Sequence, residues 1–388
     1  MSFSTPYMIF TAGLLFVSGL EIALHWSESD LRRLNFLVLV GFILFFGGSN
    51  YIGWDWTNYA EAYKDTVPLR GFLRYDGWWF NEPGFNLWMS LIRTFTTDYH
   101  IFFFVTTLLN ACLLHIFFNR YVPRKYYAFA MAIFLVVYGF TYATDLMRNF
   151  TGMMLFLFAL PYIEKRQWYF FFPIVLAGAL FHWSIALLSI CYFFLHLRIP
   201  RWAMLSIFIL GNIVFLWGMP IVSSIIKMIA NFFPTEQHDM ILDYVDNSVF
   251  GKEYGISLGF LERTLIAILV FLYYPQMTET AGKRLFVNAF FIFVFVCLYC
   301  YEYSIFITRL GALFGFGSWV IYPALLSCLD RPLKAAYWLV LSAMILLKIN
   351  SLTDNILYKY ENVIFDYPYS TYKQKRIIFN ENKERLFK

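Results

Sequence analysis

The stretch WDWTNYAEAYKDTVPLRGFLRYDGWWFNEPGF, residues 54–85, is the longest polar interval in the first half of a chain that is otherwise mostly apolar. Acids and bases alternate in it with indole and phenol rings. Rings can cover the apolar C–H faces of a pyranose, while carboxylates and amides bind its hydroxyl groups. The interval therefore predicts a carbohydrate site, and the alternative interpretation is an aromatic belt at a membrane interface.

Outside this interval the composition is that of an integral membrane protein. The chain has 388 residues, of which 60% are hydrophobic and 14% charged, whereas soluble domains are usually about 25% charged. Apolar runs of about 20 residues recur from end to end, and such runs can span a hydrocarbon core about 30 Å thick. We therefore expect an all-α fold, a polytopic bundle of membrane helices.

Twelve apolar segments are candidate membrane spans. They cover residues 7–26, 34–53, 99–118, 126–143, 146–163, 168–180, 183–196, 202–219, 258–275, 285–301, 305–327 and 334–349. Residues 83–95 and 221–233 mix apolar and polar positions and are expected to form helices that lie at the interface. The membrane domain is expected to comprise residues 1–350, with large outer loops at 54–98 and 220–257, followed by a polar, Tyr-rich tail at 351–388.

Basic residues gather in six short turns, which are expected to face the cytoplasm. These turns hold Arg32 and Arg33; Arg120, Arg124 and Lys125; Lys165 and Arg166; Arg198 and Arg201; Lys283 and Arg284; and Arg331 and Lys334. Because residues 168–196 have a basic turn at each end, we expect a short hairpin with His182 at its tip; one tilted helix is the alternative. This orientation brings both outer loops, Arg148, His182 and Arg309 to the outer face.

Two arginines lie in or beside apolar runs, where a charge is costly and usually marks a site. Arg148 occurs in DLMRNFTGMM and Arg309 in IFITRLGALFGF. A guanidinium binds phosphate oxygens in pairs and stays protonated, so two of them at one membrane face suit a diphosphate. The alternative is internal ion pairing, of Arg148 with Asp145 and of Arg309 with Glu302.

Three further residues are candidates for proton transfer. Glu82 directly precedes Pro83, at the predicted start of a helix, where a partly desolvated carboxylate could act as a general base. Asp55, at the outer end of the second candidate span, competes for this role, and the sequence does not choose between them. His182 could carry a proton or bind a phosphate, or it could be a structural donor at a helix end.

Several other chemistries lose support. The sequence contains no GxGxxG, GxxxxGK[ST], HExxH or GxSxG motif, which argues against nucleotide-driven transport, a zincin and an esterase. The five cysteines lie in apolar segments without zinc spacing, so we expect no metal and no cofactor. The net charge of +5 is spread over short loops and indicates no nucleic-acid partner. The acidic residues at 236–253 could bind a cation or a sugar, or simply be solvated.

Four short motifs together resemble those of a known family. They are EPGFNLW at 82–88, MRNFTGMMLFLFAL at 147–160, LAGALFHWSIALL at 176–188 and ITRLGALF at 307–314. In order and spacing they are similar to the Glu-Pro, Arg-Gln/Asn, Phe-His-x-Ser and late Arg motifs of the EpsG family of bacterial exopolysaccharide polymerases, which are Wzy-type enzymes. One departure is GGSNYIGWD at 47–55: Asn50 stands where family members often have an aspartate, unless Asp55 takes that place.

The resemblance implies a glycosyltransferase in the bacterial cytoplasmic (inner) membrane, with its active site facing the periplasm or cell exterior. It would transfer a growing glycan from an undecaprenyl-diphosphate carrier to a new lipid-linked repeat unit, in exopolysaccharide, capsule or O-antigen synthesis. Arg148 and Arg309 would bind the diphosphate with help from His182, and Glu82 or Asp55 would deprotonate the acceptor. The side chains expected to bind substrate are Trp54, Trp56, Arg70, Arg74, Tyr75, Trp78 and Trp79.

The implied partners are the undecaprenyl-diphosphate-linked oligosaccharide, membrane lipid, and a chain-length regulator and flippase of the same pathway. One alternative function is a flippase or other transporter of lipid-linked oligosaccharides. A flippase needs polar residues along a path through the bilayer and often has internal repeats, but here the middles of the spans are nearly free of charge and no repeat is evident. The other alternative is an O-antigen ligase-type transferase or a membrane acyltransferase.

Overall fold

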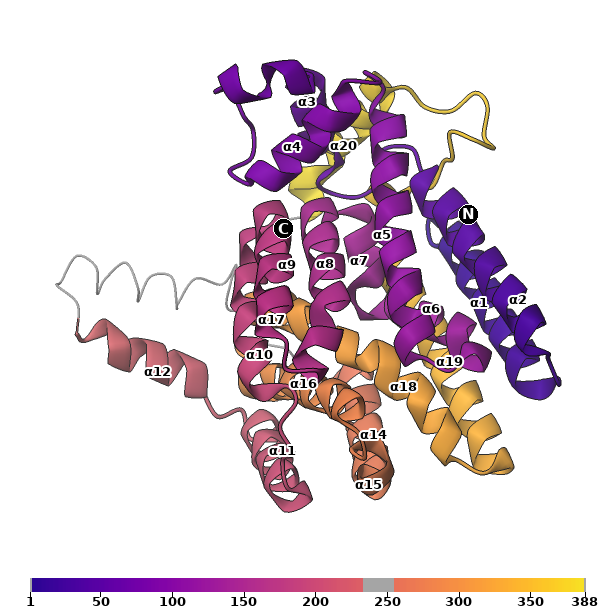
Figure 1. Ribbon diagram of the computed structural model, residues 1–388, viewed down its shortest axis with the longest axis vertical. Coiled ribbons are helices and arrows are strands. Elements are labelled where there is room, and N and C mark those ends of the chain that lie inside the picture. The colour runs from indigo at the N-terminus through magenta and orange to yellow at the C-terminus, as the bar shows by residue number, and fades with distance from the viewer. Residues whose placement is uncertain (1, 233–254, 387–388) are drawn as a thin grey trace. The chain divides into compact units, whose positions relative to one another are not determined.

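The computed structural model describes residues 2–232 and 255–386, and this part of the chain is all-α (Figure 1). The predicted fold class is therefore confirmed. The helices form two compact units, one of Met1–Tyr192 with Ser342–Lys388 and one of Phe193–Leu341. The proposed boundary at residues 350 and 351 stays a prediction. The acidic residues at 236–253 lie outside the described residues.

The first unit contains the elements that position the candidate site. Its α-helices are α1 Thr5–Ala23, α2 Glu28–Phe42, α3 Trp56–Asp65, α4 Pro83–Arg93, α5 Tyr99–Tyr121, α6 Tyr127–Phe134, α7 Phe140–Thr144, α8 Met147–Glu164, α9 Trp168–Phe181 and α20 Tyr372–Leu386, with α10 Cys191–Phe194 at its edge. Short 3-10 or π segments are η1 Ile43–Gly47, η2 Leu69–Arg74, η3 Arg124–Tyr126, η4 Leu135–Gly139, η5 Trp183–Ile190 and η6 Ile356–Tyr358.

The second unit is also helical. Its α-helices are α11 Arg201–Leu216, α12 Ile221–Ala230, α14 Leu258–Leu272, α15 Tyr274–Met277, α16 Ala281–Tyr299, α17 Ser304–Phe314 and α18 Phe316–Cys328, and α19 Arg331–Thr353 runs across the boundary between the units. Sharp bends of 86° between α11 and α12 and of 60° between α17 and α18 break two apolar segments.

Helix length and composition make the chain a multi-pass membrane protein. Five of the described helical stretches are long and apolar enough to cross a membrane, or up to seven if each bent pair is one span. The helix α1 shows why a lipid environment is needed, because Ile9 and Phe16 are 68% and 67% exposed on its surface. Large apolar side chains exposed in this way mark contact with a membrane. The number of twelve crossings stays a prediction.

An apolar cluster holds the first large loop in place on α5 and α8. Tyr63 of α3 stacks on Phe102 of α5, with ring centroids 4.4 Å apart. Phe85 and Met89, on the buried face of α4, belong to the same cluster, as does Met147 at the start of α8. Figure 1 shows α3, α4 and α20 gathered at one end of α5. The loop is thus a folded layer whose residues have fixed positions.

The segment 168–196 turns back on itself at His182, as expected. The backbone of His182 is extended (φ −160°, ψ 123°), which ends α9 and begins η5. The segment returns toward its start, because Arg166 Nη1 donates to the carbonyl of Tyr192 at 2.6 Å. One straight helix would hold these residues tens of ångströms apart, so the hairpin is confirmed over the single tilted helix.

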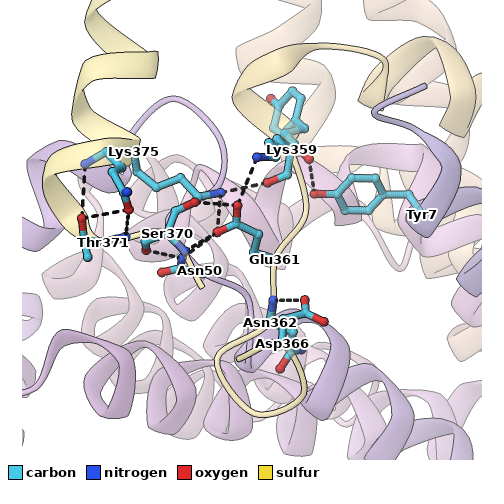
Figure 2. Close-up of polar contacts among 11 residues, drawn as sticks. Tyr7, Asn50, Lys359, Glu361, Asn362, Asp366, Ser370, Thr371 and Lys375 are labelled. Carbon is cyan, nitrogen blue, oxygen red and sulfur yellow. Dashed lines mark hydrogen bonds and ion pairs between the residues drawn. The ribbon is translucent and has the colours of Figure 1, made fainter. Parts of the chain in front are cut away.

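The C-terminal tail binds the chain at the base of the first loop (Figure 2). The backbone N–H of Asn50 donates to the carbonyl of Glu361 at 2.8 Å, and the backbone N–H of Val363 donates to the carbonyl of Gly48 at 2.8 Å. The Asn50 side chain donates to Glu361 Oε2 at 3.1 Å and to the Ser370 carbonyl at 2.8 Å. We call this set of contacts between residues 48–53 and 357–375 the tail clasp.

Candidate functional site

Glu82 lies at the N-terminal boundary of α4, with Pro83 in the first turn as the sequence predicts. Its backbone carbonyl accepts from Asn86 N–H at 3.1 Å, which starts the helix. Its carboxylate accepts no capping hydrogen bond from the helix, and the residue as a whole is 5% exposed. The carboxylate instead faces two cationic or polar side chains from other helices, and the positive end of α4 further stabilises a negative charge there.

Arg148, in the first turn of α8, is the first of these two partners. Its Nη1 donates to Glu82 Oε2 at 2.6 Å. The guanidinium carbon lies 4.1 Å from the centre of the Phe80 ring, which is a cation–π contact. The Nε atom is buried and has no hydrogen-bond partner in the described part of the chain. Glu82 and Phe80 therefore hold Arg148 in place, and one of its donors is buried without a partner.

His182, at the tip of the hairpin, is the second partner. Its Nδ1 lies 3.0 Å from Glu82 Oε1, so the two oxygens of one carboxylate contact two different side chains. The contact is possible because α9 packs directly on α4: a Cβ added to Gly84 would lie 2.8 Å from Leu180 Cβ. Three residues predicted from separate parts of the sequence, Glu82, Arg148 and His182, thus form one cluster, which we call the Glu82 cluster.

The side chains of the Glu82 cluster are partly open to solvent. Arg148 and His182 are each 23% exposed at the side chain, whereas Glu82 is 6% exposed. Tyr59 of α3 also interacts with the Arg148 guanidinium. Burial raises the pKa of Tyr59 to about 12, and the Arg148 charge opposes this shift. The cluster combines a carboxylate, an imidazole and a guanidinium, which suits proton transfer next to an anion.

The two carboxylates of the alternative ion pairs, Asp145 and Glu302, make other contacts. Asp145 accepts from the backbone N–H of Trp54, from Thr144 Oγ1 at 2.8 Å and from Tyr358 Oη at 2.9 Å. Glu302 accepts from Val222 N–H at 2.7 Å and from the hydroxyl of Ser223, at the start of α12. Asp145 therefore joins the first loop to the tail, and Glu302 holds α12.

Asp55 and Arg309, the other two predicted catalytic residues, are not members of the Glu82 cluster as defined above. Asp55 is the residue before α3 and is partly buried; its charge acts on Tyr59, which also interacts with Arg148. Arg309 is exposed on α17, in the second unit. A shared diphosphate between Arg148 and Arg309 stays a prediction.

The predicted substrate-binding residues have different surroundings. Trp56 is 4% exposed and packs edge-on against Tyr372, with centroids 5.6 Å apart. Trp78 packs against Tyr75 at 4.8 Å, while Trp79 is 47% exposed. Trp54 is partly buried, and Arg70 and Arg74 are exposed on η2.

Two contributors could not be read from the sequence. Phe80 stacks on Arg148, but nothing distinguished it from the other rings of the loop. The tail adds Tyr358, Tyr372 and Arg376, more than 200 residues from their partners, and no local sequence pattern predicts such contacts.

Among the described residues, no group of three or more His, Cys, Asp and Glu side chains is placed to hold a metal ion.

Comparison with known proteins gives one match. The model of the EpsG family matches residues 33–368, which include all of the Glu82 cluster and Arg309. No curated protein and no solved structure matches the chain.

Proposed function

Because the chain belongs to the EpsG family, and so is an exopolysaccharide-related membrane protein, we propose that it is a glycosyltransferase that polymerises lipid-linked oligosaccharide repeat units. The donor is a glycan on undecaprenyl diphosphate, and the acceptor is a second lipid-linked repeat unit. The active site faces the outside of the cytoplasmic membrane. The observation that carries this proposal is the Glu82 cluster, in which Glu82 contacts Arg148 and His182 at 2.6 and 3.0 Å.

The reaction breaks one bond and forms one bond. The bond between the anomeric carbon and the diphosphate oxygen breaks, and an acceptor hydroxyl oxygen bonds to that carbon. Glu82 accepts the hydroxyl proton as a general base, and His182 holds the carboxylate in position. Arg148 stabilises the charge that develops on the departing diphosphate, for which its side chain, 23% exposed, is partly accessible.

The contacts of Arg148 support this assignment over a purely structural ion pair. A structural arginine in a low-dielectric site usually has all its donors satisfied, whereas Nε of Arg148 is buried without a partner in the described chain. The ring of Phe80 holds the guanidinium by a cation–π contact. A planar fork held in this way is suited to phosphate oxygens. Arg309 is proposed as a second ligand of the diphosphate.

The experiment compares Arg148→Lys with Arg33→Lys, a matched change at an arginine whose side chain is 79% exposed. Each protein is reconstituted in lipid discs with purified lipid-linked repeat unit as the only substrate. We expect the wild type and Arg33→Lys to make a ladder of longer products, and Arg148→Lys to leave single repeat units. Unchanged substrate with the wild type would favour a transporter or a ligase that needs another acceptor. A normal ladder from Arg148→Lys would remove this residue from the mechanism.

A further inference from the structure

A cavity of about 450 Å³ lies between the first loop and the C-terminal tail. Its walls come from α3, the start of α5, Trp79 and the tail helix α20. This volume is within the range of about 300–1,000 Å³ typical of ligand pockets. We propose that the cavity is a subsite for uncharged sugar residues of the glycan. The proposal rests on the polymerase function above and adds where part of the glycan binds.

The cavity lining has the chemistry that recognises sugars. Rings of Tyr51, Tyr63, Tyr99, Tyr372 and Trp79 contribute to it. Trp79 is 47% exposed, so part of its indole surface is available to the C–H face of a pyranose. Phenol hydroxyls and carboxylates beside these rings supply donors and acceptors for sugar hydroxyls.

The charges around the cavity favour an uncharged ligand. The ionisable lining residues are Glu61 and Asp65, balanced by Lys64 and Arg376. A site for the diphosphate would need an excess of positive charge, and this cavity has none. We therefore assign the diphosphate to Arg148 and sugar residues to the cavity.

The polar groups of the cavity are already oriented by one another. Tyr372 Oη donates to Glu61 Oε1 at 3.0 Å, and Arg376 Nη1 pairs with the same oxygen and contacts Tyr372 Oη at 2.9 Å. Across the cavity wall, Trp79 Nε1 donates to Asp65 Oδ2 at 3.0 Å. Binding groups fixed in advance lose less entropy when a ligand binds.

The tail clasp fixes the half of the subsite that α20 provides (Figure 2). Ser370, two residues before α20, donates its N–H and its hydroxyl to Glu361 at 2.9 and 2.7 Å. Lys375, which is 6% exposed, donates to the Lys359 carbonyl at 3.0 Å. The adjacent residue Arg376 reaches the cavity. The C-terminal tail thus acts as a wall of the binding site.

Binding can be measured with the full-length protein in lipid discs by calorimetry. The probe is oligosaccharide fragments released by mild acid from the polymer of the source cells, and inorganic diphosphate is the competitor. The variants are Trp79→Ala and Tyr372→Phe, and the matched control is Lys373→Ala, an exposed position on the same helix as Tyr372. Melting temperatures confirm that each variant is folded.

We expect the dissociation constant to rise at least tenfold for Trp79→Ala and severalfold for Tyr372→Phe, with no change for Lys373→Ala and no displacement by inorganic diphosphate. Equal affinities for the wild type and both cavity variants, or displacement by diphosphate, would overturn the subsite. The ladder assay separates this result from the polymerase proposal. If Trp79→Ala weakens fragment binding but the wild type makes no ladder, only the polymerase proposal is rejected. If the wild type makes a ladder but both cavity variants bind the fragments as tightly as the wild type, only the subsite is rejected.

Discussion

Arg148 donates to the Glu82 carboxylate at 2.6 Å and so joins α8 to the residue that begins α4, 66 positions earlier in the chain. The second oxygen of Glu82 contacts His182, which comes 100 positions after Glu82 in the sequence. One carboxylate therefore connects three segments. If any of them shifts, the geometry of the other two changes as well.

Replacing Glu82 tests the general base. We expect Glu82→Gln to lower turnover about 10²–10⁴-fold, since an amide cannot accept the hydroxyl proton. Asp55→Asn is the comparison, and we expect a much smaller loss because Asp55 lies outside the Glu82 cluster. The initial rate of ladder formation from lipid-linked repeat units measures both. If both variants retain the wild-type rate, neither carboxylate is the base.

Gly84 tests whether the close approach of α4 and α9 positions the cluster. An alanine Cβ at Gly84 would lie 2.8 Å from Leu180 Cβ and 2.9 Å from the Leu180 carbonyl oxygen, so the helices must separate. We expect Gly84→Ala to reduce turnover at least tenfold because Glu82 moves away from His182. The control is Gly41→Ala, where no atom lies within 4 Å of the added Cβ. Wild-type turnover from Gly84→Ala would show that this contact is dispensable.

Asn50 tests the tail clasp. Asn50→Asp replaces an amide that donates to Glu361 and Ser370 with a carboxylate that repels Glu361. We expect the free energy of unfolding to fall by about 1–3 kcal/mol, the cost of a buried group left without its partner. Limited proteolysis should then cleave the tail faster. Asn58→Asp, on the exposed face of α3, should leave the cleavage rate unchanged, and equal rates for both variants would contradict the clasp.

Acid should weaken the same clasp through Glu361. Burial alone would raise the pKa of this carboxyl, but hydrogen bonds from Ser370 and the charge of Lys375 lower the pKa to about 2, from an ordinary value near 4.5. A carboxyl with a depressed pKa stabilises the folded state above its unfolded pKa, and this contribution is lost as the pH falls from about 4.5 to 2.

Pepsin, which is active in acid, can report this loss. We expect cleavage of the tail to accelerate in the wild type as the pH falls across this window. Glu361→Gln provides the reference because it removes the titrating group, so its cleavage should change only with the activity of pepsin itself. Identical pH profiles for the two proteins would mean that Glu361 does not anchor the tail.

The features that the sequence predicted well are those with local signals. Pro83 marks the start of α4, and the two basic turns around residues 168–196 indicate the hairpin that places His182 at its tip. A side-chain partner was harder to predict. Asp145 was the obvious neighbour of Arg148, one helical turn away, but its oxygens bind Trp54 and Tyr358. Glu82 takes its place, because helix packing rather than sequence spacing decides which charges meet.

The contacts of the C-terminal tail are even harder to predict from the sequence. Its abundance of tyrosines and charges is compatible with two arrangements, a cover over one face of the protein or a loosely ordered end. Asn50 and Glu361 are 311 positions apart, and neither occurs in a motif that points to the other. Likewise, Trp56 and Trp79 are both tryptophans of the first loop, yet one is 4% and the other 47% exposed. Only the folded chain distinguishes a core ring from a surface ring.

The tail clasp also affects how the protein is made. The ribosome must synthesise Glu361 and Ser370 before Asn50 can acquire its partners, so the first loop emerges long before its base can be secured. A nascent or prematurely terminated chain could insert its early helices in the bilayer, yet it would lack one wall of the cavity. The tail must therefore be complete before it can close this wall of the cavity.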